Sequence, residues 1–285
     1  MKLKYASFSI VGKRENNEDF HHVFHLNASS YGFVVCDGVG GHQFGEVASK
    51  TVALSIEDFF SKHGDSEFNT ATIRESVLWA QQKLKEVAEK HSSKDMACTL
   101  CFLAVSGRRA YLCWAGDSRI YFWNEQQKVF QTKDHSYVNW LIDIGEITKE
   151  EALTHPKKNV ITRSLNPIRD PDPEIKSFSL KGKNYFLICT DGVLEAVDEN
   201  ELNTIWEQHS SIEDALSFIK TACEKKCLCI LCHAYVNEHH QQNFRNNRML
   251  DDLRRFIQLY RDKLYQLGNP YLNKFESEYN SNNDY

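Results

Sequence analysis

The sequence predicts an α+β fold built from layered sheets and helices, and three observations support this class. Short runs rich in β-branched and aromatic residues form separate groups, and long helical runs follow them instead of alternating strand by strand. A chain of 285 residues is long enough for one large domain that buries about three-quarters of its unfolded surface. Its 41% apolar and 26% charged residues are typical of a globular protein and far from a disordered composition.

The N-terminal third reads as three short strands followed by two helices. Glycine breaks separate the strands, and apolar residues at helical spacing mark the helices. Thr72 and Glu75 predict a capping box in front of the second helix. The strands are expected at 8–11, 23–26 and 33–36, and the helices at 46–61 and 73–90.

A second strand-rich block occupies the middle of the chain. Turns at Gly107 and Gly116 separate its strands, and Thr148 with Glu151 can cap a short helix after it. The stretch 166–173 holds three of the five prolines and should be irregular. Strands are expected at 99–105, 110–115, 120–123, 185–190 and 228–236, and a helix at 211–223.

The composition changes after residue 237. Apolar residues there recur at every third or fourth position: Met249, Leu253, Phe256, Tyr260, Leu264 and Leu267. This spacing predicts one amphipathic helix, which Gly268 and Pro270 end. We therefore expect a domain at 1–237 and, at 238–285, a C-terminal helix with a polar tail. The apolar stripe predicts that this helix docks on its own domain or on a partner chain.

The charge balance excludes two classes of partner. Lys and Arg number 34 against 39 for Asp and Glu, so the net charge is −5, and no run of five basic residues occurs. The sequence therefore predicts neither nucleic-acid binding nor attachment to an anionic membrane.

The sequence contains no stretch of about 18 apolar residues and no apolar signal-peptide core near its start, so we expect no transmembrane helix and no secretion.

The nine cysteines are expected to be reduced, buried thiols of a cytoplasmic protein, since most lie in apolar, strand-like runs. A zinc site stays open at one cluster, although its strand-like alternation and its lack of two separated CxxC arms favour core residues. The cluster consists of Cys223, Cys227, Cys229, Cys232 and His233.

Acidic residues recur where predicted strands end. Asp37 and Asp191 each precede a glycine, Asp117 follows one, and Glu18 with Asp19 stands next to a strand. A carboxylate at the end of an apolar strand costs stability unless it is solvated, hydrogen-bonded or bound to a cation. One Asp-Gly alone is most often a turn, but four such positions favour a shared cation site. Hard oxygen ligands without His or Cys partners indicate Mg²⁺ or Mn²⁺ rather than zinc.

These positions belong to motifs whose order resembles that of the metal-dependent, type 2C serine/threonine protein phosphatases. The motifs are Arg14-Glu15-Asn16-Asn17-Glu18-Asp19, Asp37-Gly38-Val39-Gly40-Gly41-His42, Gly116-Asp117-Ser118-Arg119 and Thr190-Asp191-Gly192. The resemblance covers roughly residues 5–236, and its Asp-Gly-x-Gly-Gly-His form is similar to the bacterial, signalling branch. It implies a four-layer α-β-β-α sandwich, in which two antiparallel sheets pack face to face between helices.

The resemblance also implies a metal site for two Mn²⁺ or Mg²⁺ ions. Asp37 would bridge both ions, and the Gly38 carbonyl would bind one of them. Asp191 would hold the second ion, and Glu18 and Asp19 would act directly or through bound waters.

Three further roles follow from the same resemblance. Asp117 matches a residue that holds a third, weaker ion. Arg14 matches the arginine that binds the substrate phosphate, and its planar fork suits phosphate oxygens. His42 would be either the general acid for the leaving alkoxide or a residue that orients the glycine loop. Asp134, His135, Arg119 and Arg163 are expected to brace loops.

The reaction implied is hydrolysis of phosphoserine and phosphothreonine in proteins. Two cations lower the pKa of a water, which attacks phosphorus in line, so no covalent intermediate is needed. The absence of a Cys-x5-Arg phosphatase loop agrees with this route. The segment 135–170 matches the family's flap beside the active site, and it could fold onto the sandwich through Trp140, Leu141, Ile142 and Ile144.

One departure from the family keeps an alternative function open. The family's Asp-Asn before the last strand is absent, and Lys226-Cys227 stands in its place. A pseudophosphatase, or a binding or regulatory module with a weakened metal site, is therefore the second hypothesis. Lys226 is expected to point outward and leave room for a water, in preference to Glu224 swinging in as a ligand. An effector delivered by a bacterium to a host cell also stays open.

Overall fold

The computed structural model describes residues 2–12, 16–39, 44–63, 67–125, 127–209 and 211–226, and the path of the chain at 230–238. Contacts divide the chain into two units, Met1–His240 and Gln241–Tyr285, and every element named below belongs to the first. The predicted C-terminal helix lies outside the described residues.

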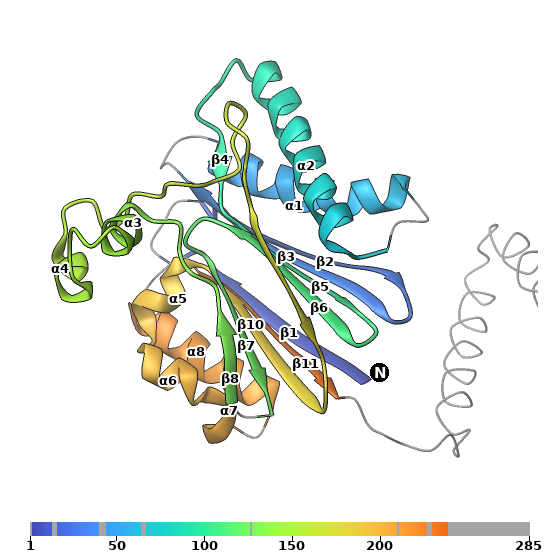
Figure 1. The fold of residues 1–285 in the computed structure, drawn as a ribbon, viewed down its shortest axis with the longest axis vertical. Helices are drawn as coiled ribbons and strands as arrows, with labels where there is room; N and C mark the ends of the chain where they lie inside the picture. Colours follow the sequence, from blue (N-terminus) through green and yellow to red (C-terminus); the bar gives the residue numbers. More distant parts are fainter. Residues whose placement is uncertain are drawn as a thin grey trace, which may run out of the picture. The chain divides into compact units, whose positions relative to one another are not determined.

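Two antiparallel sheets form the centre of the first unit (Figure 1). One sheet contains, in order, β1 (Lys2–Ile10), β11 (Ile230–Glu238), β10 (Lys183–Cys189), β7 (Arg119–Asn124) and β8 (Gln127–Gln131). The other contains β2 (Asp19–Asn27), β3 (Ser30–Val39), β5 (Leu100–Ser106), β6 (Arg109–Ala115) and β9 (Glu174–Ser179), and β4 (Ala97–Cys98) pairs with β3.

Helices cover the outer faces of both sheets, which gives the predicted four-layer sandwich. The second sheet carries α1 (Gly45–Lys62) and α2 (Thr70–Lys90). The first sheet carries α5 (Asp191–Ala196), α6 (Glu199–Asn203), α7 (Ile205–Gln208) and α8 (Ile212–Lys226). Two short helices, α3 (Tyr137–Asp143) and α4 (Lys149–Thr154), lie between β8 and β9.

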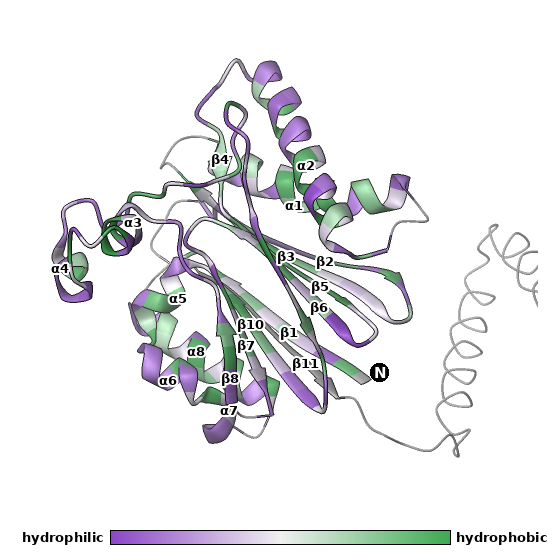
Figure 2. Ribbon diagram, in the orientation of Figure 1, coloured by the Kyte–Doolittle hydropathy of each residue, from purple (hydrophilic) through white to green (hydrophobic). Residues whose placement is uncertain are grey.

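The core explains why the central strands are apolar on both faces. In β3, Phe33 and Val35 pack between the sheets, whereas Val34 and Cys36 pack against the helices α1 and α2. Such a strand is buried on both sides and therefore reads as a continuous apolar run. Figure 2 shows hydrophobic residues concentrated along the facing strands and hydrophilic ones along much of α2.

Helix starts confirm one predicted cap and correct another. Thr148 and Glu151 form the expected capping box of α4, with hydrogen bonds of 2.7 and 3.2 Å. The box at α2 was wrongly assigned to Thr72 and Glu75. It consists of Asn69, whose side chain accepts from the Thr72 N–H, and Thr72, whose hydroxyl accepts from the Asn69 N–H. A short amide side chain reaches the first turn well, so the helix begins earlier than its apolar periodicity shows.

Besides the two-residue β4, two strands were not predicted: β8 and β9. Both lie at sheet edges and are largely exposed, so their sequences lack the apolar alternation that marks half-buried strands. Of the four residues expected to fold the flap onto the sandwich, Trp140 and Ile144 are 50% and 51% exposed, so the expectation is wrong for these two, whereas Leu141 and Ile142 are half-buried.

Buried thiols are confirmed wherever cysteine side chains are described. Six are free and buried: Cys36, Cys98, Cys101, Cys113, Cys189 and Cys223. Cys223 lies in the core between α8 and the first sheet, and the other side chains of its cluster are outside the description. Among the described helices, none has both the length and the apolar character needed to cross a membrane.

Candidate metal centre

Asp19 and Asp37 stand directly opposite each other where β2 begins and β3 approaches its end. Opposed residues of an antiparallel pair point to the same side of the sheet, and two carboxylates there repel each other. The two carboxyl groups are hydrogen-bonded to one another, which requires a shared proton when no cation separates them. Asp19 is buried and Asp37 is half-buried, so water screens this repulsion weakly.

Two more carboxylates reach the same place from other elements. Asp191 is the first residue of α5, directly after β10, and Asp117 lies in the turn between β6 and β7. The pKa of Asp37 is raised well above its usual value by burial and then by the charges of Asp19, Asp191 and Asp117. Burial, followed by the charge of Asp191, raises the pKa of Asp117 to about 7. Both sheets therefore contribute acidic groups to one edge of the sandwich.

Thr99 connects two of these positions and was not predicted as a site residue. Its N–H donates to the Asp37 carbonyl at 2.8 Å, and its hydroxyl oxygen accepts from the Asp37 N–H at 3.0 Å. The same hydroxyl is hydrogen-bonded to Ser118 at 2.8 Å, next to Asp117. A hydroxyl residue at the start of an apolar strand is the only signal for this role in the sequence.

Thr190 makes a similar connection between the sheets. Its hydroxyl donates to a carboxylate oxygen of Asp19 at 3.0 Å, and it directly precedes Asp191. The end of β10 is thereby held against the start of β2.

Glu18 is held at the start of α1 by close backbone packing. Its carbonyl accepts from the Gly38 N–H at 3.1 Å and from the Ser49 hydroxyl at 2.6 Å. A Cβ on Gly45 would lie 2.8 Å from the Glu18 carboxyl carbon, and one on Gly38 would lie 2.5 Å from the Gly45 carbonyl carbon. Only glycine at both positions lets the Glu18 side chain approach this edge.

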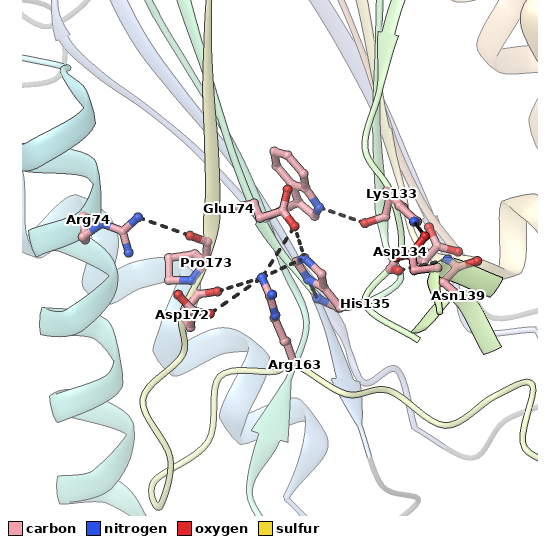
Figure 3. Close-up of polar contacts among 12 residues, drawn as sticks. Arg74, Lys133, Asp134, His135, Asn139, Arg163, Asp172, Pro173 and Glu174 are labelled. Carbon is pink, nitrogen blue, oxygen red and sulfur yellow. Dashed lines mark hydrogen bonds and ion pairs between the residues drawn. The ribbon is translucent and has the colours of Figure 1, made fainter. Parts of the chain in front are cut away.

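His135 supports the turn that carries Asp117. Its Nδ1 accepts from the Gly116 N–H at 3.2 Å, and its backbone N–H donates to the Gly116 carbonyl at 2.9 Å. The ring proton therefore belongs on Nε2, which donates to Glu174 at 3.1 Å (Figure 3). Burial lowers the pKa of His135, which keeps the imidazole neutral near pH 7. Gly116 has a φ of +114°, a conformation that favours glycine.

The arginines of this region bind protein carboxylates, as expected for loop-bracing residues. Arg119 makes two hydrogen bonds of 2.7 Å to Asp134. Arg163 lies 3.5 Å from Glu174 and 3.8 Å from Asp172, and Figure 3 shows it beside His135.

Not every predicted site residue can be placed. Arg14 and His42 lie outside the described residues, so their roles stay predictions. Across the parts of the chain that are described, no three acidic, His or Cys side chains form a finished metal-coordination group. The carboxylates converge, but Asp19 and Asp37 bind each other where a cation would have to separate them.

Lys226 is the last residue of α8, and its side chain binds the backbone of α5. It is exposed, and its ammonium group donates to the Glu195 carbonyl near the end of α5 at 2.5 Å. Glu224 is also exposed and lies 3.8 Å from Lys220 on the same helix. The exposure of Lys226 agrees with the expected outward orientation, and the water expected in the place of the family's aspartate stays a prediction.

Comparisons with known proteins agree with this fold and these motifs. The family model for protein phosphatase 2C matches residues 9–224. Protein phosphatase PhpP of Streptococcus pneumoniae is 30% identical over 200 residues, which are 68% of this chain and 79% of that protein.

Solved structures of bacterial serine/threonine phosphatases are also similar to this chain. Serine/threonine phosphatase Stp1 from Staphylococcus aureus has a TM-score of 0.74 at 28% identity, over 84% of this chain and 96% of its own. The catalytic domain of serine/threonine protein phosphatase PstP, solved in complex with two manganese ions, has a TM-score of 0.65 at 25% identity. That match covers 82% of this chain and 97% of the PstP chain.

Proposed function

The chain belongs to the protein phosphatase 2C family, and from this premise we propose how it hydrolyses phosphoserine and phosphothreonine in proteins. The chain is a protein serine/threonine phosphatase, and nothing among its relatives favours the pseudophosphatase alternative. Its relatives are bacterial enzymes, and they lend no support to the idea of an effector delivered to a host cell.

The observation that carries the proposal is the convergence of Asp19, Asp37, Asp117 and Asp191. Four carboxylates from different elements at one buried edge repel each other, and a divalent cation removes that repulsion. The donors are all oxygens, which fits Mn²⁺ or Mg²⁺. The family is metal-dependent, and the PstP neighbour holds two manganese ions.

The ligand assignment follows the family motifs. Asp37 would bridge two ions, the Gly38 carbonyl would bind one, and Asp191 would bind the other. Glu18 and Asp19 would act directly or through water. Asp117 would hold a third and weaker ion.

Bound cations would acidify a water and offset charge on the phosphoryl oxygens. Side chains of the protein would bind the substrate phosphate and assist the leaving group. Arg14 would bind phosphate oxygens through its planar guanidinium, and His42 would protonate the leaving alkoxide or orient the glycine loop. Burial raises the pKa of the Cys113 and Cys189 thiols to about 12, so neither supplies a thiolate for a covalent intermediate.

The test is phosphate release from a phosphoserine peptide by the full chain. We expect turnover with Mn²⁺, loss of turnover in excess chelator, and recovery when Mn²⁺ is added back. Zn²⁺ should restore less activity, because this oxygen-only site suits harder cations. Full activity in excess chelator would exclude the metal-dependent reaction.

A second prediction concerns the missing aspartate at Lys226. Because Lys226 stands where the family has an aspartate, the second ion would lack one carboxylate, and activity should need more Mn²⁺ than a complete site does. The double change Lys226→Asp with Cys227→Asn should lower the Mn²⁺ concentration for half-maximal rate about tenfold, an effect typical of changing groups around a metal. Glu224→Ala is the control and should leave that concentration unchanged. If Glu224→Ala instead abolishes activity while the double variant gains nothing, Glu224 is the replacement ligand.

We also propose that the amphipathic segment at 238–285 docks on its own domain or on a partner chain. The support is its apolar stripe, which would otherwise remain in water. Deletion of residues 240–285 should reduce solubility and increase binding of an apolar dye. A truncated protein that stays monomeric, soluble and equally stable would show that the segment is a free tail.

A further inference from the structure

A pocket of about 380 Å³ opens beside the metal edge. Val39 of β3 and Ala97 of β4 are paired with each other, and both line this pocket. Because Val39 is two residues beyond Asp37 on β3, the pocket begins at that distance along the strand. At about 3.3 Å per residue along a strand, the pocket lies about 7 Å from Asp37. An extended peptide has the same spacing. A side chain two to four residues from a phosphoresidue at the metal edge would therefore reach it.

The wall of this pocket is fixed by hydrogen bonds. Cys98 and Leu165 exchange two backbone hydrogen bonds of 3.0 and 2.9 Å, which join β4 to the loop at 164–169. Gln81 of α2 donates to the carbonyls of Asn166 and Arg169 in that loop. The Asn166 side chain accepts from the Arg169 N–H at 2.9 Å. The loop is thus held in place before any ligand binds.

The charge of the pocket is positive although the whole chain is acidic. Lys94 and Arg169 line it together with one carboxylate, Asp95. In the portion of the chain that the structure describes, neither the Lys94 ammonium nor the Arg169 guanidinium makes an ion pair or a hydrogen bond. Ser164 and Asn166 add polar groups, and Ile168, which is 68% exposed, adds an apolar one.

We propose that this pocket binds an acidic side chain of the phosphoprotein substrate, two to four residues from the phosphoserine or phosphothreonine. Lys94 and Arg169 bind the carboxylate, and Ile168 contacts the aliphatic part of the same side chain. The inference rests on the proposed function, since it requires the phosphate to lie at the metal edge. Both cations are exposed, so the preference is moderate and falls at high salt.

The experiment compares phosphoserine peptides that differ only in flanking residues. One carries Glu two to four residues before the phosphoserine, one carries Glu after it, and the third carries Gln at all these positions. The full chain with saturating Mn²⁺ should show kcat/KM about three- to tenfold higher for one Glu peptide than for the Gln peptide. The ratio of kcat/KM for that Glu peptide to kcat/KM for the Gln peptide should approach one in the Lys94→Ala/Arg169→Ala double variant. It should fall below one in Arg169→Glu.

Both values of kcat/KM are measured on the same preparation of each variant, so a loss of folded protein lowers both equally and leaves their ratio unchanged. Arg109→Ala is the matched control: Arg109 is exposed at the start of β6, the end of that strand remote from Asp117, and its removal should leave the ratio unchanged. Equal rates on Glu and Gln peptides would overturn the pocket assignment and leave the phosphatase intact. If the double variant kept the full preference for the Glu peptide, the pocket assignment would also be overturned, and the phosphatase activity would again be unaffected. Failure to release phosphate from any peptide would overturn the proposed function and this inference together.

Discussion

Asp37→Asn should lower the phosphatase kcat/KM at least about a thousandfold, because it removes the proposed bridging carboxylate from both ions. The metal-free fold should persist and should unfold at the same or a higher temperature. In the metal-free protein, burial and three other carboxylates raise the pKa of Asp37, so a neutral amide there removes the cost of ionising this group. The measurements are kcat/KM on an aryl phosphate with Mn²⁺, and thermal unfolding in excess chelator.

Glu213→Gln is the control for this variant. It also removes one negative charge, but Glu213 is exposed on α8, away from the carboxylate edge, and activity should not change. More than a tenth of the normal activity in Asp37→Asn, at the same Mn²⁺ concentration, would contradict the bridging role. A large fall in the unfolding temperature in chelator would show instead that Asp37 supports the fold.

Metal removal should make the stability of the protein fall as pH rises from about 4 to 8. The folded-state pKa values of Asp37 and Asp117 lie above the usual Asp value, so in this range the folded state binds more protons than the unfolded state. The free energy of unfolding therefore decreases with pH, and the Asp117 contribution is lost through a pKa of about 7. Saturating Mn²⁺ should cancel this loss, because cation binding stabilises the ionised carboxylates.

The buried His135 and the half-buried His21 change the stability in the opposite direction, and their effect must be separated from that of the carboxylates. Burial lowers the pKa of His135 and of His21, so their contributions to stability increase as pH rises through the usual His range. The comparison is therefore between the parent chain and Asp117→Asn in chelator, both unfolded thermally at pH 5 and pH 8. The parent should lose roughly 5 °C more than the variant between these pH values. Identical pH dependence in both proteins would show that Asp117 is not perturbed by its neighbours.

The sequence by itself determined the class of fold, most of its central elements and the set of acidic candidates. Strands such as β5 and β6 are apolar along most of their length because both faces are buried there, and that property is visible without a structure. Asp37, Asp117 and Asp191 stand at strand ends, and their residue types alone indicate a hard cation. Local pattern also predicted the α4 capping box, because all of its hydrogen bonds lie within four residues.

Only the tertiary structure decided which groups meet. Asp19 lies opposite Asp37 because the register of β2 against β3 places it there, and register depends on burial of whole strand faces. Thr99 is marked in the sequence only by its place at the start of an apolar strand, and its role exists because β4 and β5 run beside β3. Lys226 binds the Glu195 carbonyl because α8 continues to that residue and ends beside the end of α5. Each of these contacts joins residues distant in the chain, and no periodicity of 2 or 3.6 residues encodes such a contact.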